Sequence, residues 1–531
     1  MTTPKRRRRR IAGVAAAMLI APGAASAATP GPGSPSLTVR LDSGRIHGIE
    51  TDTTRRFLGI PYASPPVGDL RWAPPQPPKP WRGVREAAAT GSACPQAAPG
   101  QDPITDEDCL FVNVTTPRDA EPGSGLPVMV WWHGGGFTQD SGNYYHAERL
   151  ADQGNVIVVT VNYRLGILGY FGLPGLPGSG NFGLADQIAS LEWTKRNAAA
   201  FGGDPANITV FGQSAGAMSI CALLTSPRAD GLFAKAAVSS GSCLLRWPNG
   251  GLYPGAAAQA PYLPLRRVQE DGLAVARDLG ASPGRELADM REKPVAELLT
   301  KTQGFTNHLA YGTGLLPMDP AAAVQAGAFT RVPMISGNTR DEARSFVAGA
   351  MMVDPDRITA ETYPGLLRNA FGDNAAAVAA EYPLSEYPSA GLAWATVVTD
   401  HTWAGQTQAG NREFARHTTV YPYEFADPDA PNVNGVEVPE VPQGAAHATD
   451  LPSLFELHGH DLLTDPAQRE MSRTMIGYWT AFARTGDPNH EGAPHWPAGT
   501  DGGRAMRFTP GAVEPADVAT EHHAEFWRSL G

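Results

Sequence analysis

Residues 208–224 read Ile-Thr-Val-Phe-Gly-Gln-Ser-Ala-Gly-Ala-Met-Ser-Ile-Cys-Ala-Leu-Leu. The apolar and β-branched start, 208–211, predicts a buried strand, and residues 217–224 can begin a helix. Between them stands a Gly-x-Ser-x-Gly pattern, which would place Ser214 on a sharp strand-to-helix turn with its hydroxyl clear of both elements. Glycines on either side let such a strained turn close. We therefore interpret Ser214 as a candidate nucleophile, the alternative being a serine that only caps the helix.

A second glycine-rich segment, residues 131–137, ends another predicted strand and reads Trp-Trp-His-Gly-Gly-Gly-Phe. Consecutive glycines let backbone N–H groups approach a ligand without side chains in the way, as a preformed anion site requires. An oxyanion hole here, completed by the N–H of Ala215, would stabilise a tetrahedral intermediate. Either motif alone could be a tight turn, but the two together favour a nucleophilic hydrolase.

Outward from these motifs, short apolar runs alternate with helical patterns. Apolar runs predict strands at 110–114, 126–132, 156–161, 208–211, 234–238 and 332–335, and a hairpin at 37–39 and 45–49. Helical spacing predicts helices at 184–200, 268–279, 375–381 and 471–483. This alternation favours an α/β fold with a mostly parallel sheet covered by helices on both faces. Residues 247–319 and 347–409 lack the rhythm and look like helical insertions above the sheet.

Length and composition exclude several classes of protein. The chain has 531 residues, of which 42% are hydrophobic and 18% charged, so it is neither disordered nor fibrous. Its formal net charge is −11, from 42 Lys and Arg against 53 Asp and Glu, which argues against nucleic-acid binding. Length alone would allow three or four domains.

The amino terminus has the pattern of a secretory signal peptide. A basic run at 5–10 precedes an apolar stretch at 11–20, and Ala25-Ser26-Ala27 offers a cleavage site. The alternatives, a nucleic-acid arm or a membrane anchor, fail because this stretch is too short to cross about 30 Å of hydrocarbon. We therefore expect residues 1–27 to be removed and the protein to be secreted, with no stable membrane anchor. The mature chain would carry 36 Lys and Arg against 53 acids, a formal charge of −17.

Export makes disulfides possible, and the four cysteines allow three pairings. Two local loops, Cys94 with Cys109 and Cys221 with Cys243, are the simplest arrangement. Free buried thiols remain the alternative, more so for the second pair.

With these motifs, the chain resembles the type B carboxylesterases of the α/β-hydrolase superfamily, which are related to cholinesterases and para-nitrobenzyl esterases. The resemblance covers almost the whole mature length. It rests on the two glycine motifs and, in the family's order, on residues 57–62, 107–110, 162–164, 180–187, 201–205 and 482–488. It implies an α/β-hydrolase fold with large helical insertions over a gorge-like active site, in a single domain at 28–531.

The family order of Ser, acid and His then implies partners for Ser214. The acid corresponds to Glu342, although Asp341 is an adjacent competitor and Ala343 stands where the family usually has Gly. A triad acid fixes the tautomer of the histidine and stabilises its protonated form. By the same resemblance the oxyanion donors are Gly135, Gly136 and Ala215.

The base corresponds to His447, which has small residues before it and Asp450-Leu451 after it, as in the family. His458 and His460 lie nearby in the sequence but do not match this context. The base would take the Ser214 proton.

No cofactor or metal is expected. The 13 His residues are scattered, and no His-Glu-x-x-His, Cys/His ligand pattern, P-loop or dinucleotide-binding fingerprint accompanies a predicted element.

The expected substrate is a small neutral carboxylic ester with a short or medium acyl chain. Residues 95–108 contain no aromatic side chain, and Gln213 occupies the position that is acidic in cholinesterases, so choline esters are disfavoured. Amides, carbamates or a polyester surface remain alternatives because they share the acyl-enzyme step. A binding protein of the same fold without catalysis is disfavoured because all parts of the triad are present. The sequence does not indicate an oligomeric state.

Overall fold

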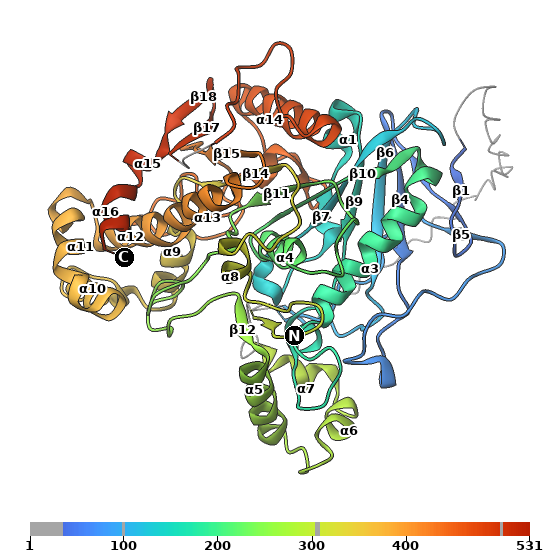
Figure 1. The fold of residues 1–531 in the computed structure, drawn as a ribbon, viewed down its shortest axis with the longest axis horizontal. Helices are drawn as coiled ribbons and strands as arrows, with labels where there is room; N and C mark the ends of the chain where they lie inside the picture. The colour runs from blue at the N-terminus through green and yellow to red at the C-terminus, as the bar shows by residue number, and fades with distance from the viewer. Residues whose placement is uncertain (1–35, 98–100, 303–307, 500–502, 531) are drawn as a thin grey trace, which may run out of the picture. The chain divides into compact units, whose positions relative to one another are not determined.

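The computed structural model describes residues 36–97, 101–302, 308–499 and 503–530, so the predicted signal peptide lies outside the described residues. An 11-stranded sheet runs through it in the order β18-β17-β15-β14-β11-β10-β7-β9-β6-β4-β3 (Figure 1). Its strands are β3 (Ile49–Glu50), β4 (Thr54–Pro61), β6 (Phe111–Pro117), β7 (Leu126–Trp132), β9 (Ile157–Val161), β10 (Gly203–Gln213), β11 (Lys235–Ser239), β14 (Met334–Thr339), β15 (Val420–Phe425), β17 (Arg504–Thr509) and β18 (Ala512–Asp517).

The centre of this sheet, from β9 through β7, β10, β11, β14 and β15 to β17, is parallel, and antiparallel pairs form only towards the two edges. Every residue of β7, β9, β11 and β15 is buried, as expected for parallel strands covered on both faces. The predicted α/β fold with a mostly parallel sheet is confirmed.

Helices cover the sheet and form the insertions. They are α1 (Glu148–Gly154), α2 (Gly166–Tyr170), α3 (Phe182–Asn197), α4 (Ala215–Leu224), α5 (Leu265–Asp278), α6 (Glu286–Arg291), α7 (Val295–Leu299), α8 (Pro320–Gln325), α9 (Arg344–Val353), α10 (Tyr363–Phe371), α11 (Ala375–Glu381), α12 (Ala390–Val398), α13 (Gly405–Ala415), α14 (Pro466–Thr485), α15 (Val518–Glu521) and α16 (Ala524–Ser529). Between α12 and α13 the helix continues as a π-helical turn, η9 (Thr399–Ala404).

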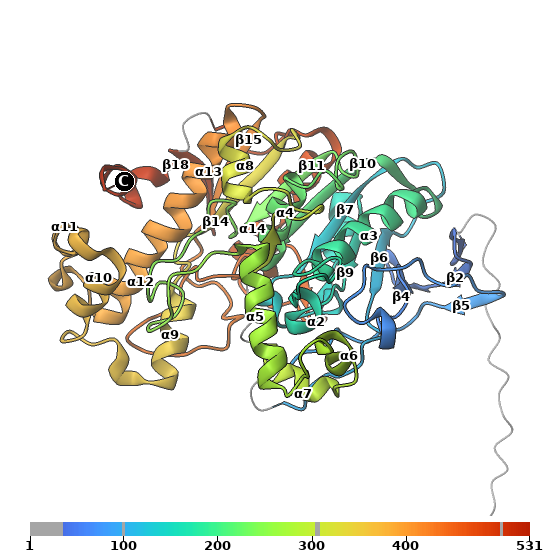
Figure 2. The same ribbon diagram turned by 60° about the horizontal axis from the view of Figure 1, so that its bottom comes forward.

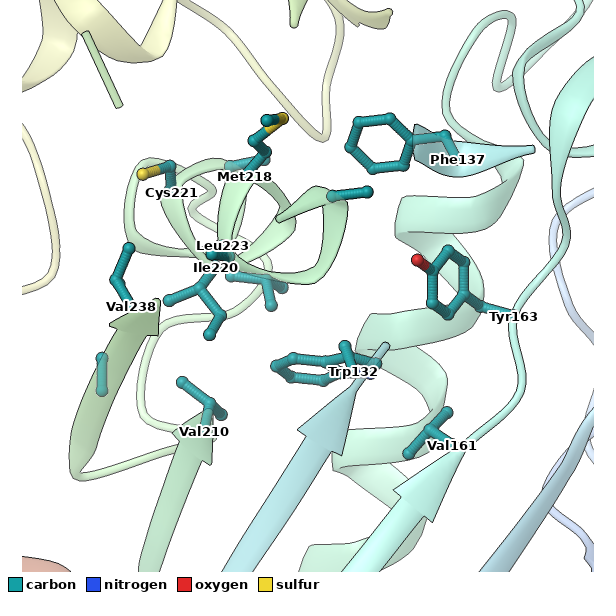
Figure 3. Packing of buried hydrophobic residues seen from close by; sticks show 14 of the residues in the cluster. Trp132, Phe137, Val161, Tyr163, Val210, Met218, Ile220, Cys221, Leu223 and Val238 are labelled. Carbon is teal, nitrogen blue, oxygen red and sulfur yellow. The ribbon is translucent and has the colours of Figure 1, made fainter. Parts of the chain in front are cut away.

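Alternate residues of the strands face two separate apolar cores. On β7, Val128, Val130 and Trp132 belong to the core that α3 and α4 complete, where Figure 3 shows Trp132 near Val210 and Ile220. The intervening Met129 and Trp131 belong to the core completed by α1 and α14. The sheet is therefore held between two helical layers, and its carboxyl edge is fixed from both sides.

The two regions without a strand–helix rhythm carry helices, as predicted. Residues 247–319 contain α5, α6 and α7, and residues 347–409 contain most of α9 and all of α10 to α12. Figure 2 shows α5 to α7 grouped together and α10 to α12 grouped separately from them.

Some elements differ from the sequence prediction. β15 carries Pro422 inside a central strand, a residue that argues against such an assignment because it cannot donate to the ladder. The predicted strand at 332–335 begins and ends later, as β14. The predicted hairpin forms as β1 (Thr38–Arg40) and β2 (Arg45–His47), but it pairs with β5 (Val84–Glu86) outside the large sheet.

Four further short strands pair outside the large sheet. β12 (Tyr262–Pro264) pairs with β13 (Leu309–Tyr311), and β8 (Tyr145–His146) pairs with β16 (Glu456–Leu457).

Both local disulfides are formed. Cys94 pairs with Cys109, and Cys221 pairs with Cys243, so the alternative of free thiols, which the sequence left open for both pairs, is excluded. Within the described residues, no helix has the length and apolar character needed to cross a membrane.

Candidate active site

Ser214 lies on the turn that joins β10 to α4. Its φ of +54° and ψ of −120° are strained for a residue with a side chain. The chain approaches closely on both sides, because a Cβ on Gly212 or Gly216 would lie 2.8 Å or 2.0 Å from the carbonyl oxygen of Trp132. Ser214 is partly exposed although both its neighbours are buried. The predicted turn therefore presents the hydroxyl outward and needs both glycines.

The glycine run at 134–136 lies beside this turn. A Cβ on Gly134 would lie 3.1 Å from Cβ of Ser214. Gly135 and Gly136 have φ of +78° and +61°, in the left-handed region that favours glycine. Ala215 begins α4, so the positive end of that helix dipole also faces this region. The structure thus brings the two glycine motifs together.

His133 fixes the base of the glycine run. Its buried ring stacks on Tyr163 at 4.4 Å between ring centroids, and the Tyr163 hydroxyl donates to the backbone oxygen of His133 at 2.8 Å. Burial lowers the pKa of His133, so the ring stays neutral. His133 therefore holds backbone in place and adds no charge.

Glu342 follows β14 and is fully buried against His447. His447 Nδ1 donates a hydrogen bond to Glu342 Oε2, while Glu342 Oε1 accepts from the backbone N–H of Thr339 at 2.9 Å. A proton on Nδ1 leaves Nε2 of the neutral ring with a lone pair. This pair has the geometry of an oriented base.

Asp341, the adjacent competitor, points elsewhere. Its Oδ2 accepts from the backbone N–H of Ala445 at 3.0 Å, and it forms ion pairs with Arg340 and Arg344. Asp341 therefore ties down the loop that carries His447, and Glu342 alone of the two contacts the imidazole.

The contact between base and nucleophile is not made in this structure. Among the described residues, no hydrogen bond joins the Ser214 hydroxyl to His447; instead Nε2 of Gln213 lies 3.1 Å from Nε2 of His447. Because Gln213 immediately precedes Ser214, this contact places the imidazole beside the turn. Catalytic hydrogen bonds are often long in substrate-free enzymes and tighten when substrate binds.

Aromatic side chains surround the other side of the imidazole. The rings of Phe346 and Trp403 lie 5.0 Å and 4.9 Å from that of His447, and Tyr253, which is half exposed, lies 5.9 Å from Phe346. Trp403 comes from η9, whose Thr399 hydroxyl accepts from the backbone N–H of Ala343 at 3.0 Å. These neighbours could not be found from the sequence, because no local pattern marks residues so far apart in the chain.

A second carboxyl, Asp450, is buried near Glu342. Burial raises the pKa of Asp450 to about 7, and the negative charge of Glu342 adds to this rise. The Tyr423 hydroxyl lies 3.3 Å from its Oδ2. Below neutral pH, therefore, Asp450 is mainly protonated and carries little negative charge.

The remaining histidine candidates lie apart from this pair. His458 and His460 are exposed, and His458 stacks on Tyr144 at 4.3 Å. In the described parts of the chain, no group of three or more His, Cys, Asp or Glu side chains is placed to hold a metal ion.

Other motif residues hold the scaffold. Arg164 binds Asp186 through its Nε and one terminal nitrogen, both at 2.7 Å and fully buried. Gln187 Nε2 donates to the Ser219 hydroxyl on α4 at 2.9 Å. These contacts join α3 to the nucleophile helix and to the end of β9.

Comparison with known proteins gives a consistent result. The sequence matches the Carboxylesterase family over residues 35–527. It is 36% identical over 477 residues to the para-nitrobenzyl esterase of Bacillus subtilis, covering 87% of this chain and 92% of that protein. It is 34% identical to the fumonisin B1 esterase of Sphingopyxis macrogoltabida over 501 residues, covering 89% and 86%.

The solved structures agree. A thermophilic PNB esterase superimposes with a TM-score of 0.75 at 31% identity, and a second PNB esterase with 0.74 at 32%. Each covers 92% of this chain and 99% of its own.

Proposed function

The chain belongs to the carboxylesterase family and is a carboxylic ester hydrolase of the serine type; from this premise we propose that it hydrolyses neutral esters through an acyl-enzyme on Ser214, with His447 as general base and Glu342 as orienting acid. The hydrogen bond between His447 Nδ1 and the buried Glu342, beside the turn of Ser214, carries the proposal. It gives the imidazole the tautomer that a general base needs.

The reaction runs in two halves. Ser214 Oγ attacks the carbonyl carbon while its proton passes to His447 Nε2, and the intermediate then collapses as the bond to the alcohol breaks and the alcohol oxygen takes that proton. Water repeats the sequence on the acyl-enzyme and releases the acid. The backbone N–H groups of Gly135, Gly136 and Ala215 would hold the oxyanion in both halves.

The aromatic side chains beside His447 support a preference for apolar alcohol groups. His447 delivers its proton to the alcohol oxygen, so groups packed against the imidazole lie near the departing alcohol. Phe346, which is partly exposed, occupies that position, whereas Trp403 packs on the imidazole but is itself buried. The name of the para-nitrobenzyl esterase indicates an ester with an aromatic alcohol, which agrees with this preference. Nothing in the site favours amides, carbamates or a polyester over such esters.

The acyl-enzyme is tested by covalent labelling. A fluorophosphonate should label the wild-type protein at one site, Ser214, with parallel loss of p-nitrophenyl butyrate hydrolysis, because only an activated serine beside oxyanion donors reacts readily. Intact-protein mass and peptide mapping measure the label, and Ser214→Ala should take up none. Labelling of Ser214→Ala at the wild-type rate would contradict the proposal.

The alcohol preference is tested by truncating Phe346. Phe346→Ala should lower kcat/KM for p-nitrobenzyl acetate about tenfold more than for ethyl acetate, because the lost ring would otherwise cover apolar surface of the larger alcohol. Both esters give the same acyl-enzyme, so the ratio isolates the alcohol side. If the ratio of kcat/KM for the two esters is the same in Phe346→Ala as in the wild type, the alcohol group does not bind against Phe346.

We also propose that residues 1–27 are a signal peptide, that residues 28–531 form one domain and that the protein is secreted. The basic and apolar segments with the Ala-Ser-Ala site support this, and two disulfides fit an oxidising compartment.

A further inference from the structure

The lone pair of His447 Nε2 is occupied by a side chain that the mechanism does not use. Nε2 of the Gln213 amide lies 3.1 Å from it. Because Nδ1 donates to Glu342, Nε2 of the neutral imidazole can only accept, so the amide N–H is the donor. In serine hydrolases this same lone pair takes the proton of the nucleophile.

The fold builds a place for this amide. Gln213 is 2% exposed, and its backbone is fixed where β10 pairs with Ser239 of β11. A Cβ on Gly134 would lie 2.7 Å from Gln213 Oε1, so the first glycine of the run leaves room for the amide. The side chain thus lies between the glycine run and the imidazole.

We propose that Gln213 acts directly on the catalytic histidine: its amide donates to His447 Nε2 in the resting enzyme and must leave that position before Ser214 can pass its proton to the ring. This inference rests on the proposed function of Ser214 and His447. It explains why the resting structure has a Gln213–His447 contact and no Ser214–His447 hydrogen bond.

The proposal has a consequence for pH dependence. An N–H donor favours the neutral imidazole and opposes its protonation, since a protonated Nε2 would place two donors face to face. Glu342 is the carboxylate in contact with the ring, Asp450 is mainly protonated below neutral pH, and the packed Phe346 and Trp403 carry no charge. Gln213 therefore extends activity to lower pH than the contact with Glu342 alone would allow.

The test follows the rate of fluorophosphonate labelling from pH 5 to pH 9 in the intact protein. Gln213→Met, which keeps the length but removes the donor, should move the acidic limb to higher pH by about 0.5 to 1 unit. Gln213→Glu should move it further, by more than about 1 unit, because a carboxylate accepts from the protonated ring. A merely structural role would lower the rate without moving the limb.

Gln187→Met is the matched control, because Gln187 is also buried and hydrogen-bonded but contacts Ser219 rather than His447. The acidic limb of its labelling rate against pH should coincide with that of the wild type. If Gln213→Met does not fold, Gln213→Asn keeps the amide but shortens its reach, and its limb should move in the same direction. An unmoved limb in folded Gln213 variants would overturn the inference while leaving the proposed function intact. Absence of labelling in the wild type would overturn the proposed function itself.

Discussion

Replacing His447 with alanine is expected to lower kcat/KM for p-nitrophenyl butyrate by about 10⁴- to 10⁶-fold. Without the imidazole, Ser214 has no acceptor for its proton, and the alcohol has no donor as it leaves. Glu342 cannot substitute, because it is fully buried and its Oε1 is held by the backbone N–H of Thr339. The measurement is initial rates on purified protein across pH 6 to 9.

His460→Ala is the matched control, because His460 is an exposed histidine in the same stretch of chain. It should keep full activity. A His447→Ala variant with more than a tenth of wild-type kcat/KM would show that another group serves as the base.

Replacing His522 with alanine is expected to cost about 3 to 5 kcal/mol of unfolding free energy, because it leaves the buried carboxylate of Asp400 without its cation and removes one of the two cations that bind Glu424. His522 Nδ1 lies 2.6 Å from Asp400 and Nε2 lies 2.6 Å from Glu424, which also binds Arg507 at 2.7 Å. The measurement is urea unfolding near neutral pH, followed by tryptophan fluorescence.

The same cluster predicts a pH dependence of stability. Burial alone would lower the pKa of His522, but Asp400 and Glu424 raise it to about 10, above the ordinary value of 6.5. The folded state therefore holds a proton that the unfolded state loses, and the stabilisation is complete below pH 6.5 and is lost as pH rises towards 10. His522→Ala should remove this loss between pH 6.5 and 10.

His523 supplies the control within the same pair of histidines. It is partly exposed and bonds through Nδ1 to Glu381. His523→Ala should cost less than about 1 kcal/mol, in the range of surface ion pairs. Equal losses of unfolding free energy for both variants would show that the buried ion pairs of His522 stabilise the fold no more than a surface ion pair does.

The fold could be predicted because its signals are local. The pattern around Ser214 requires a strand, a turn and a helix in sequence, and the apolar runs are long enough to identify most central strands. The strand β15 was not predicted, because Pro422 breaks the strand pattern. In the structure, the residues that flank Pro422 and a hydrogen bond from Trp496 Nε1 to the Pro422 oxygen hold this strand in the sheet. Tertiary contacts there override local preference.

The candidate site likewise contains some residues that the sequence could identify and others that it could not. Ser214 and the glycine run stand in short motifs, whereas His447 was chosen by resemblance in its flanking residues. The contact of Gln213 with His447 spans more than 200 residues, and nothing in the local sequence marks it. The aromatic neighbours Phe346 and Trp403 were not predicted for the same reason. The position of each ring beside His447 depends on how distant parts of the chain fold over the sheet.

The π-helical turn η9 lies within one unbroken helical segment from Ala390 to Ala415. From this turn, Asp400 reaches the imidazolium of His522, while Trp403 packs on His447. Deleting a single residue here would rotate everything downstream by about 100° relative to what precedes it. Asp400 and Trp403 could then no longer both keep their partners, so this stretch should tolerate substitution far better than any change in its length.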